Sequence, residues 1–118
     1  MKKIYHLANC STCQEILDSF GSNLPNFDLQ DIKTQKITEK QLGEMHALAG
    51  SYEALFSRRA LKYRELGLNT QSLTEAQYKK YILEEYTFLK RPVVINEKQI
   101  FIGNAPKVVA AARESMKK

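Results

Sequence analysis

YHLANCSTCQ, at residues 5–14, is the stretch that decides the fold, because an apolar run ends there and a helical pattern begins. It also contains Cys10 and Cys13, the only two cysteines of the chain. We expect both sulfurs to lie at the N-terminus of a helix, where the helix dipole and free N–H groups favour a thiolate. The stretch therefore predicts a reactive cysteine rather than an inert, buried one.

The residues on either side extend this pattern into a strand and a helix. Residues 3–7 read as a β-strand, and Ser11 with Gln14 has the form of a capping box that opens a helix. The helix has one apolar face and is expected to stop at Gly21. Residues 27–32 then alternate apolar and polar side chains, which predicts a strand whose buried face carries Phe27, Leu29 and Ile32. The first unit should be a parallel βαβ unit.

The rest of the chain divides into a helical stretch, a hairpin and a last helix. Residues 33–88 are helical in pattern, with two further capping boxes that begin at Thr38 and Thr74. One helix there should carry a stripe of Tyr78, Ile82 and Tyr86. Residues 93–102 then read as a β-hairpin, and Asn104 and Pro106 should open the last helix.

This order predicts an α/β fold, a thioredoxin-like βαβ–ββα mixed sheet with an all-helical insertion between the second and third strands. We expect one domain over residues 1–118. Its core would be formed by residues 1–32 and 89–118, and the helical insertion by residues 33–88.

Length, composition and charge narrow the class of protein. A chain of 118 residues, 43% hydrophobic, can bury a core without a disulfide. No apolar run approaches the roughly 18–20 residues of a membrane span, so we expect a cytoplasmic protein with no membrane partner. In that compartment a Cys-x-x-Cys pair favours redox or metal chemistry. The net charge of +5 is dispersed, which favours small anions over direct binding of nucleic acid.

Four segments together resemble the glutaredoxin-linked arsenate reductase and Spx family, and the resemblance spans nearly the whole chain. They are Tyr5-His6 with CSTC at 10–13, LFSRR at 55–59, YRELGL at 63–68 and RPVV at 91–94. Any one motif is unspecific, but their order and spacing identify the family. The resemblance implies a thioredoxin-like fold with a helical subdomain that faces the active-site loop.

The resemblance also implies roles for the residues of the loop. Cys10 takes the position of the nucleophile, and the spacing of Cys13, about one helical turn on, would let it act as the resolving thiol. Many arsenate reductases of this family have no cysteine at that position, whereas Spx-like regulators carry a Cys-x-x-Cys switch. We expect His6, Ser11 and Thr12 to bind substrate or to stabilise the thiolate.

Arginines are expected to bind the anion, because a guanidinium holds oxyanions and carboxylates in bidentate fashion. Arg91 matches a substrate-binding arginine of the family, and Pro92 after it would be cis. Arg59 matches a second one when counted back from residues 63–66, but Arg58 does when counted forward from residue 50. Residues 101–104, where better-known arsenate reductases have a third arginine, contain no basic side chain. That departure puts efficient reduction of arsenate in doubt.

These residues predict a thiol-dependent oxidoreductase in which Cys10 attacks an oxyanion or a disulfide. Cys13 or an external thiol would resolve the adduct. The substrate would be a small anion or glutathione, and the electron donor glutathione with glutaredoxin, or thioredoxin. No tightly bound cofactor is expected.

Two other classes of protein fit parts of the pattern. An Spx-like regulator would use a Cys10–Cys13 disulfide as a redox switch and would bind RNA polymerase. A zinc-binding or purely structural module could use both cysteines with His6 and His46, but the histidines do not follow any usual zinc-finger spacing. We therefore predict no metal site.

Overall fold

The structure, a computed structural model, describes residues 1–117, and it divides into two compact units. The first unit comprises Met1–Lys36 and Arg91–Lys118, and the second comprises Ile37–Lys90. The first contains a four-stranded mixed sheet, and the second is helical and is inserted between the second and third strands. This confirms the predicted α/β fold with its helical insertion.

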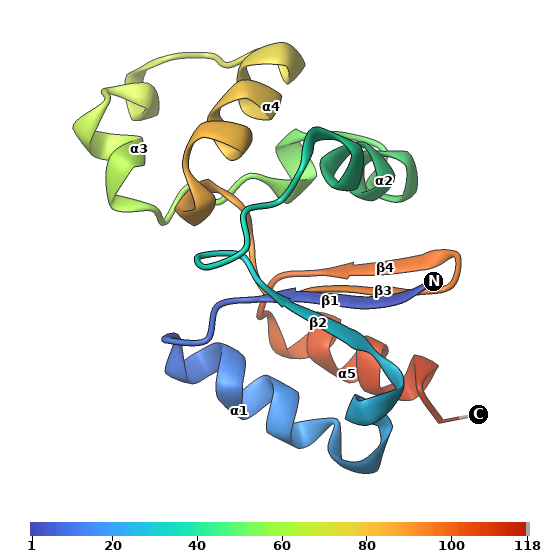
Figure 1. Cartoon of the computed structure of the whole chain (residues 1–118). Coiled ribbons are helices and arrows are strands. Elements are labelled where there is room, and N and C mark those ends of the chain that lie inside the picture. Colours follow the sequence, from blue (N-terminus) through green and yellow to red (C-terminus); the bar gives the residue numbers. More distant parts are fainter. Residues whose placement is uncertain (118) are drawn as a thin grey trace. The chain divides into compact units, whose positions relative to one another are not determined.

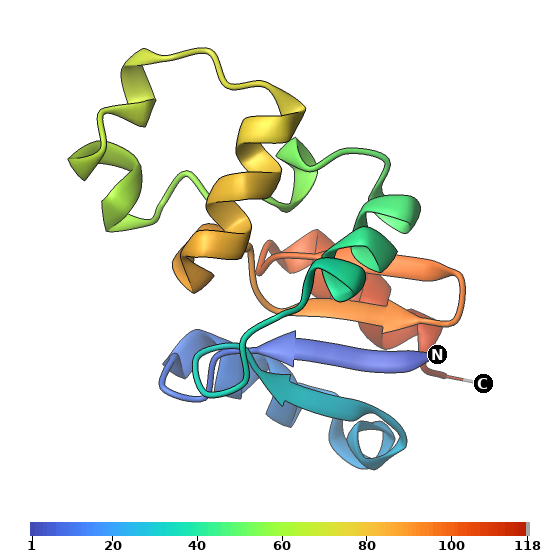
Figure 2. The same ribbon diagram turned by 45° about the horizontal axis from the view of Figure 1, so that its top comes forward.

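The sheet of the first unit has the strand order β2-β1-β3-β4 (Figures 1 and 2). Strand β1 (Lys2–His6) pairs in parallel with β2 (Asp28–Asp31), so the predicted parallel βαβ unit is confirmed. On its other side β1 pairs antiparallel with β3 (Val93–Asn96), which forms a hairpin with β4 (Gln99–Ile102). Because this pairing is antiparallel, the segment before β3 lies beside the C-terminal end of β1, where the cysteine loop begins.

Two helices cover one face of this sheet, α1 (Ser11–Ser19) and α5 (Pro106–Ser115) (Figure 1). Ile4 of β1 and Val94 of β3 face each other on the covered face. Together with buried side chains of the two helices and of the segment between α1 and β2, they form one core. The other members are Ile16, Leu17, Phe20, Phe27, Val109, Ala112 and Met116.

Two predicted helix N-caps are each wrong by one position. The N-cap of α1 is Cys10, in extended conformation, and Ser11 is the first helical residue, so the predicted capping box at Ser11 does not form. The reason is the turn before it, in which the Cys10 N–H donates to the Leu7 carbonyl. Helix α5 has Ala105 as its N-cap rather than Asn104, because Pro106, whose φ is already helical, starts the helix at its first position.

The buried face of β2 also differs from the prediction. Phe27 and Ile32 are buried as expected, but Leu29 is 40% exposed and Gln30 is 1% exposed. Strand β2 lies at the edge of the sheet, where a side chain can project past the covering helix. Gln30 can be buried because its Nε2 donates to the carbonyl of Gln35 at 3.0 Å.

The second unit contains α2 (Glu39–Ala49), α3 (Leu61–Glu65) and α4 (Glu75–Glu84). Both predicted capping boxes are present, at Thr38 of α2 and Thr74 of α4. Short 3-10 turns occur at Gly21–Asn26 (η1), Glu53–Leu55 (η2), Leu68–Thr70 (η3) and Tyr86–Phe88 (η4).

Helix α4 ends before Tyr86, so the predicted helical stripe through Tyr86 is wrong. Glu85 is extended, with φ −137°, and its carboxylate accepts from the N–H of Thr87. Glu85 is therefore the N-cap of η4. Because an N-cap residue has a non-helical backbone, α4 ends before it.

Phe56 is the centre of the second unit. Its ring stacks on Phe88 at 4.9 Å and meets Tyr78 at 4.9 Å and Tyr63 at 5.9 Å. The backbone next to it is also paired, since Ser57 N–H donates to the Phe88 carbonyl and Lys90 N–H donates to the Leu55 carbonyl. Tyr78 is buried and Tyr63 is half-buried, so this aromatic packing forms the core of the unit.

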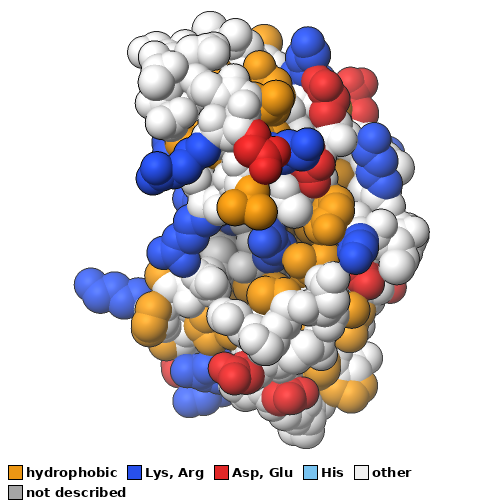
Figure 3. All heavy atoms as spheres, turned by 90° about the vertical axis from the view of Figure 1, so that its left-hand side faces the viewer, with side chains coloured by type: hydrophobic (Ala, Val, Ile, Leu, Met, Phe, Trp, Pro, Cys, Tyr) orange, Lys and Arg blue, Asp and Glu red, His pale blue; other side chains and the backbone are white. Residues whose placement is uncertain are grey.

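Charged side chains are mixed on the surface. On the face drawn in Figure 3, lysine and arginine side chains occur in separate groups among acidic, apolar and neutral ones. Within residues 1–117, no helix has both the length and the apolar character needed to cross a bilayer.

Candidate active site

The cysteine loop joins the end of β1 to the start of α1. Strand β1 ends at His6, the chain turns through a hydrogen bond from Cys10 N–H to the Leu7 carbonyl at 3.1 Å, and α1 begins at Ser11. Cys10 is therefore the N-cap residue. The first N–H groups of a helix have no intrahelical acceptor, so they are available to a group at the N-cap.

The Cys10 sulfur accepts hydrogen bonds from these free N–H groups. The pKa of Cys10 is lowered chiefly by a hydrogen bond from the backbone N–H of Cys13, with further contributions from the Cys13 thiol, the Thr12 N–H and the charge of Arg91. Partial burial opposes the shift but does not reverse it. Cys10 is half-buried, which leaves its sulfur open to a reagent. The arrangement favours a nucleophilic thiolate.

Cys13 behaves in the opposite way. Its side chain is 1% exposed, and desolvation raises its pKa to about 11. The Leu7 backbone and Arg91 pull the pKa down, whereas the neighbouring Cys10 raises it. Both cysteines are free thiols, and a hydrogen bond joins them. The pair is therefore asymmetric, with a thiolate at Cys10 stabilised by a protonated thiol at Cys13.

Arg91 and Pro92 lie directly before β3. The peptide bond between them is cis, as the family resemblance implied. Pro92 is buried, and its carbonyl accepts from Gly103 N–H at 2.9 Å, which continues the hairpin by one pair. Arg91 lowers the pKa of both cysteines. The fold thus brings this arginine into the electrostatic field of the thiol pair.

The other residues predicted to act on the thiolate are Ser11, Thr12 and His6, and they differ in how far they are buried. Ser11 and Thr12 are exposed, and Thr12 acts on Cys10 through its backbone N–H rather than its hydroxyl. His6 is 9% exposed, and burial lowers its pKa against the opposing charge of Asp31. Its Nδ1 has no hydrogen-bond partner in the part of the chain that the structure describes. The imidazole is thus neutral near pH 7, and a role for His6 at the thiolate stays a prediction.

Arg58 and Arg59 both belong to the second unit, and the structure distinguishes them. The Arg58 guanidinium donates to Glu53 Oε2 at 2.7 Å and to the Tyr78 hydroxyl at 3.0 Å, and the bond to Glu53 raises the pKa of Arg58. Arg59 is exposed, and its guanidinium makes no hydrogen bond or ion pair with any residue in 1–117. Arg59 is therefore the arginine of the two that is available to an anion.

The free N–H groups that the sequence predicts at the helix N-terminus are those of Thr12 and Cys13. The sequence placed the N-cap at Ser11 rather than Cys10, so it did not identify which N–H groups these are. Lys107 lies in the first turn of α5 and is exposed. Over residues 1–117, no group of three or more histidine, cysteine, aspartate or glutamate side chains is placed to hold a metal ion.

Comparisons with known proteins agree with this fold. The chain matches the model of the ArsC family over residues 5–112. Among curated proteins it is 26% identical over 105 residues to the global transcriptional regulator Spx 2 of Bacillus anthracis, covering 87% of this chain and 79% of the relative. It is 24% identical over 104 residues to Spx 1 of Bacillus cereus, with the same two coverages.

Solved structures of similar shape cover almost the entire chain. A protein from Bacteroides fragilis described as ArsC family related superposes with a TM-score of 0.78 at 22% identity, over 94% of this chain and 96% of that one. An arsenate reductase from Vibrio cholerae superposes with a TM-score of 0.75 at 21% identity, over 94% and 96% of the two chains. At this identity the likeness shows the fold alone.

Proposed function

Because the chain belongs to the ArsC family, we propose that it is a thiol-dependent oxidoreductase in which Cys10 is the nucleophile and Cys13 the resolving thiol. The observation that carries the proposal is the asymmetry of the two thiols. The pKa of Cys10 is lowered by backbone N–H groups and Arg91, whereas the pKa of Cys13 is raised to about 11. Thiol–disulfide exchange needs a thiolate nucleophile and, to resolve the mixed disulfide, a second thiol within reach of it, and this pair supplies both.

The reaction on a disulfide would take two exchange steps. The Cys10 thiolate attacks one sulfur of the substrate disulfide, forms a mixed disulfide and releases the other half as a thiolate. Cys13 then loses its proton and attacks the Cys10 sulfur, which forms the Cys10–Cys13 disulfide and releases the second half as a thiolate. The substrate gains two electrons, and an external thiol such as glutathione with glutaredoxin, or thioredoxin, returns them to the protein.

The order of these steps follows from charge. While Cys10 is a thiolate, its charge raises the pKa of Cys13 and keeps that sulfur protonated. When Cys10 enters a mixed disulfide that charge disappears, so the pKa of Cys13 falls and its sulfur becomes the better nucleophile. Cys13 would thus act second because the first step lowers its pKa.

The test is reduction of glutathione disulfide and of arsenate, each with glutaredoxin or thioredoxin as the donor. We expect turnover on the disulfide and a Cys10–Cys13 disulfide in the oxidised protein, seen by mass spectrometry of peptides. The disulfide should have a potential above the roughly −300 mV of structural bridges, so that reduced glutathione opens it. Finding only intermolecular disulfides after mild oxidation would count against Cys13 as the resolving thiol.

A second candidate function, a redox-sensing transcriptional regulator, is favoured by two observations. Curated relatives of this chain are named as Spx regulators, and residues 101–104 contain no basic side chain that could complete an anion site. The same Cys10–Cys13 disulfide would then switch a surface that binds RNA polymerase. If the disulfide forms but no substrate is turned over with either donor, this function becomes the better one.

Replacing Arg91 by lysine should lower turnover about tenfold, because lysine keeps the charge but loses the bidentate fork that holds an anion. The pKa of Cys10 should stay low in Arg91→Lys and rise in Arg91→Gln, since only the second change removes the positive charge that lowers it. Steady-state kinetics and alkylation over a pH series check the two effects separately. Arg113→Lys, at another arginine of the same unit, is the control and should change neither.

Arg59→Ala should lower turnover while the unfolding midpoint stays within about 2 °C, because its guanidinium has no partner to lose. Arg58→Ala should leave turnover nearly unchanged and lower the free energy of unfolding by about 1 kcal/mol, since it leaves Glu53 and Tyr78 without their shared donor. Thermal unfolding and kinetics on both variants measure this. If Arg59→Ala keeps full turnover and Arg58→Ala loses it, Arg58 is the anion ligand.

A further inference from the structure

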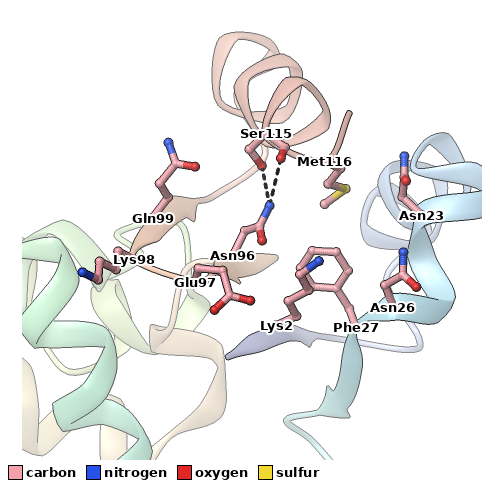
Figure 4. A pocket seen from close by; sticks show the side chains of 10 residues that line it. All are labelled: Lys2, Asn23, Asn26, Phe27, Asn96, Glu97, Lys98, Gln99, Ser115 and Met116. Atoms are coloured by element: carbon pink, nitrogen blue, oxygen red, sulfur yellow. Dashed lines mark hydrogen bonds between the residues drawn. The ribbon is translucent and has the colours of Figure 1, made fainter. Parts of the chain in front are cut away.

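A cavity of about 480 Å³ opens in the first unit, at the end of the sheet where β1 begins and β3 ends (Figure 4). It is lined by residues of β1, of η1, of the β3–β4 turn and of the end of α5. Its lining residue on β1 is Lys2, whereas the cysteine loop follows His6 at the other end of that strand. Four steps of about 3.3 Å place roughly 13 Å between them. The cavity is therefore separate from the thiol pair.

Asn96 supplies a fixed hydrogen-bond acceptor in this cavity. Its side chain is 9% exposed, and its Nδ2 donates to both the carbonyl and the hydroxyl of Ser115, each at 3.1 Å. Because a carbonyl can only accept, this contact determines which end of the Asn96 amide is nitrogen. The oxygen Oδ1 points away from Ser115 into the cavity (Figure 4) and accepts from no group in residues 1–117. A ligand with an O–H or N–H donor would satisfy it.

The remaining polar groups of the cavity are carboxamides and ammonium groups. Asn23 and Asn26 of η1 line it, as do Lys2 and Lys98, and the Lys98 ammonium is directed away from the other lining side chains (Figure 4). None of these four side chains makes a hydrogen bond or an ion pair with another residue of the described chain. The carboxylate in the lining, Glu97, is held by the N-terminal ammonium at 3.0 Å. The groups left for a ligand are thus the Lys2 ammonium and several amides.

The floor of the cavity is apolar. Phe27 and Met116 both line it, and each is 8% exposed, so a ligand would meet only the edges of these side chains. An apolar edge beside amides and a fixed acceptor suits the ring of a sugar, which presents C–H groups and hydroxyls together. The Lys2 ammonium suits a phosphate, which lysine binds as a point charge. We propose that this cavity binds a phosphorylated sugar, free or within a nucleotide.

The test is NMR titration of the full ¹⁵N-labelled chain with ribose 5-phosphate, AMP, ribose and inorganic phosphate. We expect ribose 5-phosphate and AMP to shift the side-chain amide signals of Asn23, Asn26 and Asn96 at millimolar concentration, and ribose or phosphate alone to bind at least about tenfold more weakly. Tighter binding of AMP than of ribose 5-phosphate would identify the ligand as a nucleotide. Equal affinities would identify it as a sugar phosphate.

Variants of the lining residues show whether the ligand binds in this cavity or elsewhere on the surface. The double variant Lys2→Gln with Lys98→Gln should weaken binding of ribose 5-phosphate about tenfold, and Asn26→Ala should weaken it without changing the fold. Lys33→Gln with Lys36→Gln removes the same charge from exposed lysines of the same unit outside the cavity, and it should have no effect. Cys10→Ser should also leave binding intact, whatever the outcome for the proposed oxidoreductase.

Three results would overturn the proposal. They are equal binding of phosphate and ribose 5-phosphate, loss of binding in the control lysine variant to the same extent, and no amide shift at about 10 mM ligand.

Discussion

Replacing Cys10 by serine should abolish turnover, with a loss of about a thousandfold or more, because a hydroxyl in this setting is not ionised and cannot attack sulfur. In the wild-type protein at pH 7, an alkylating reagent should label Cys10 at least about a hundredfold faster than Cys13. A thiol with the ordinary pKa of 9.0 is roughly 1% thiolate at pH 7, and the lowered pKa of Cys10 makes that a lower limit. With its pKa raised to about 11, Cys13 is only about 0.01% thiolate.

The pH dependence has a defined direction. Labelling of Cys10 should rise with pH and reach half of its maximum rate below pH 9.0, the ordinary pKa of a thiol, whereas labelling of Cys13 should still be rising near pH 10. Cys13→Ser is the matched variant, since it keeps the backbone N–H that lowers the Cys10 pKa most and removes only the thiol. Mass spectrometry of labelled peptides over a pH series measures both rates. Equal labelling of the two sulfurs at every pH would contradict the asymmetry on which the proposed function depends.

Replacing Phe56 by alanine should destabilise the protein by about 3–5 kcal/mol, the usual cost of removing a fully buried ring. The side chain is 0% exposed and its ring contacts three other aromatic rings, so little of the cavity can close. Since small domains are stable by only about 5–15 kcal/mol, the midpoint of thermal unfolding should fall by at least about 10 °C.

The control for this change is Leu61→Ala. Leu61 is 80% exposed, so its loss should cost less than about 0.5 kcal/mol. Phe56→Leu should fall between the two, because it keeps most of the buried apolar volume. Urea unfolding followed by circular dichroism gives all three values. A cost below about 1 kcal/mol for Phe56→Ala would mean that the aromatic cluster does not hold the second unit together.

Features that depend on neighbours in sequence could be predicted without the structure. The capping boxes at Thr38 and Thr74 each involve a partner three residues away, so the pattern determines them locally. The same holds for the thiol pair at the start of a helix, where Cys10 and Cys13 are separated by less than one turn. The order of strands and helices followed from local patterns as well, and from that order the sheet with its helical insertion.

Features that depend on tertiary contacts could not be predicted in this way. Leu29 is exposed and Gln30 is buried, the opposite of what the alternating pattern predicts. The reasons are that β2 lies at the edge of the sheet and that the Gln35 carbonyl accepts a hydrogen bond from Gln30. Arg58 differs from Arg59 only because Glu53 and Tyr78 hold its guanidinium.

Spacing along the chain was therefore enough to predict the fold class, the family resemblance and the position of the reactive pair. How strongly the two sulfurs differ depends on the tertiary structure. Burial raises the pKa of Cys13, while backbone N–H groups at the helix N-terminus and Arg91, carried there by the pairing of β1 with β3, lower that of Cys10. Desolvation and charge depend on what lies around an atom in space, and a pattern of residues does not record that.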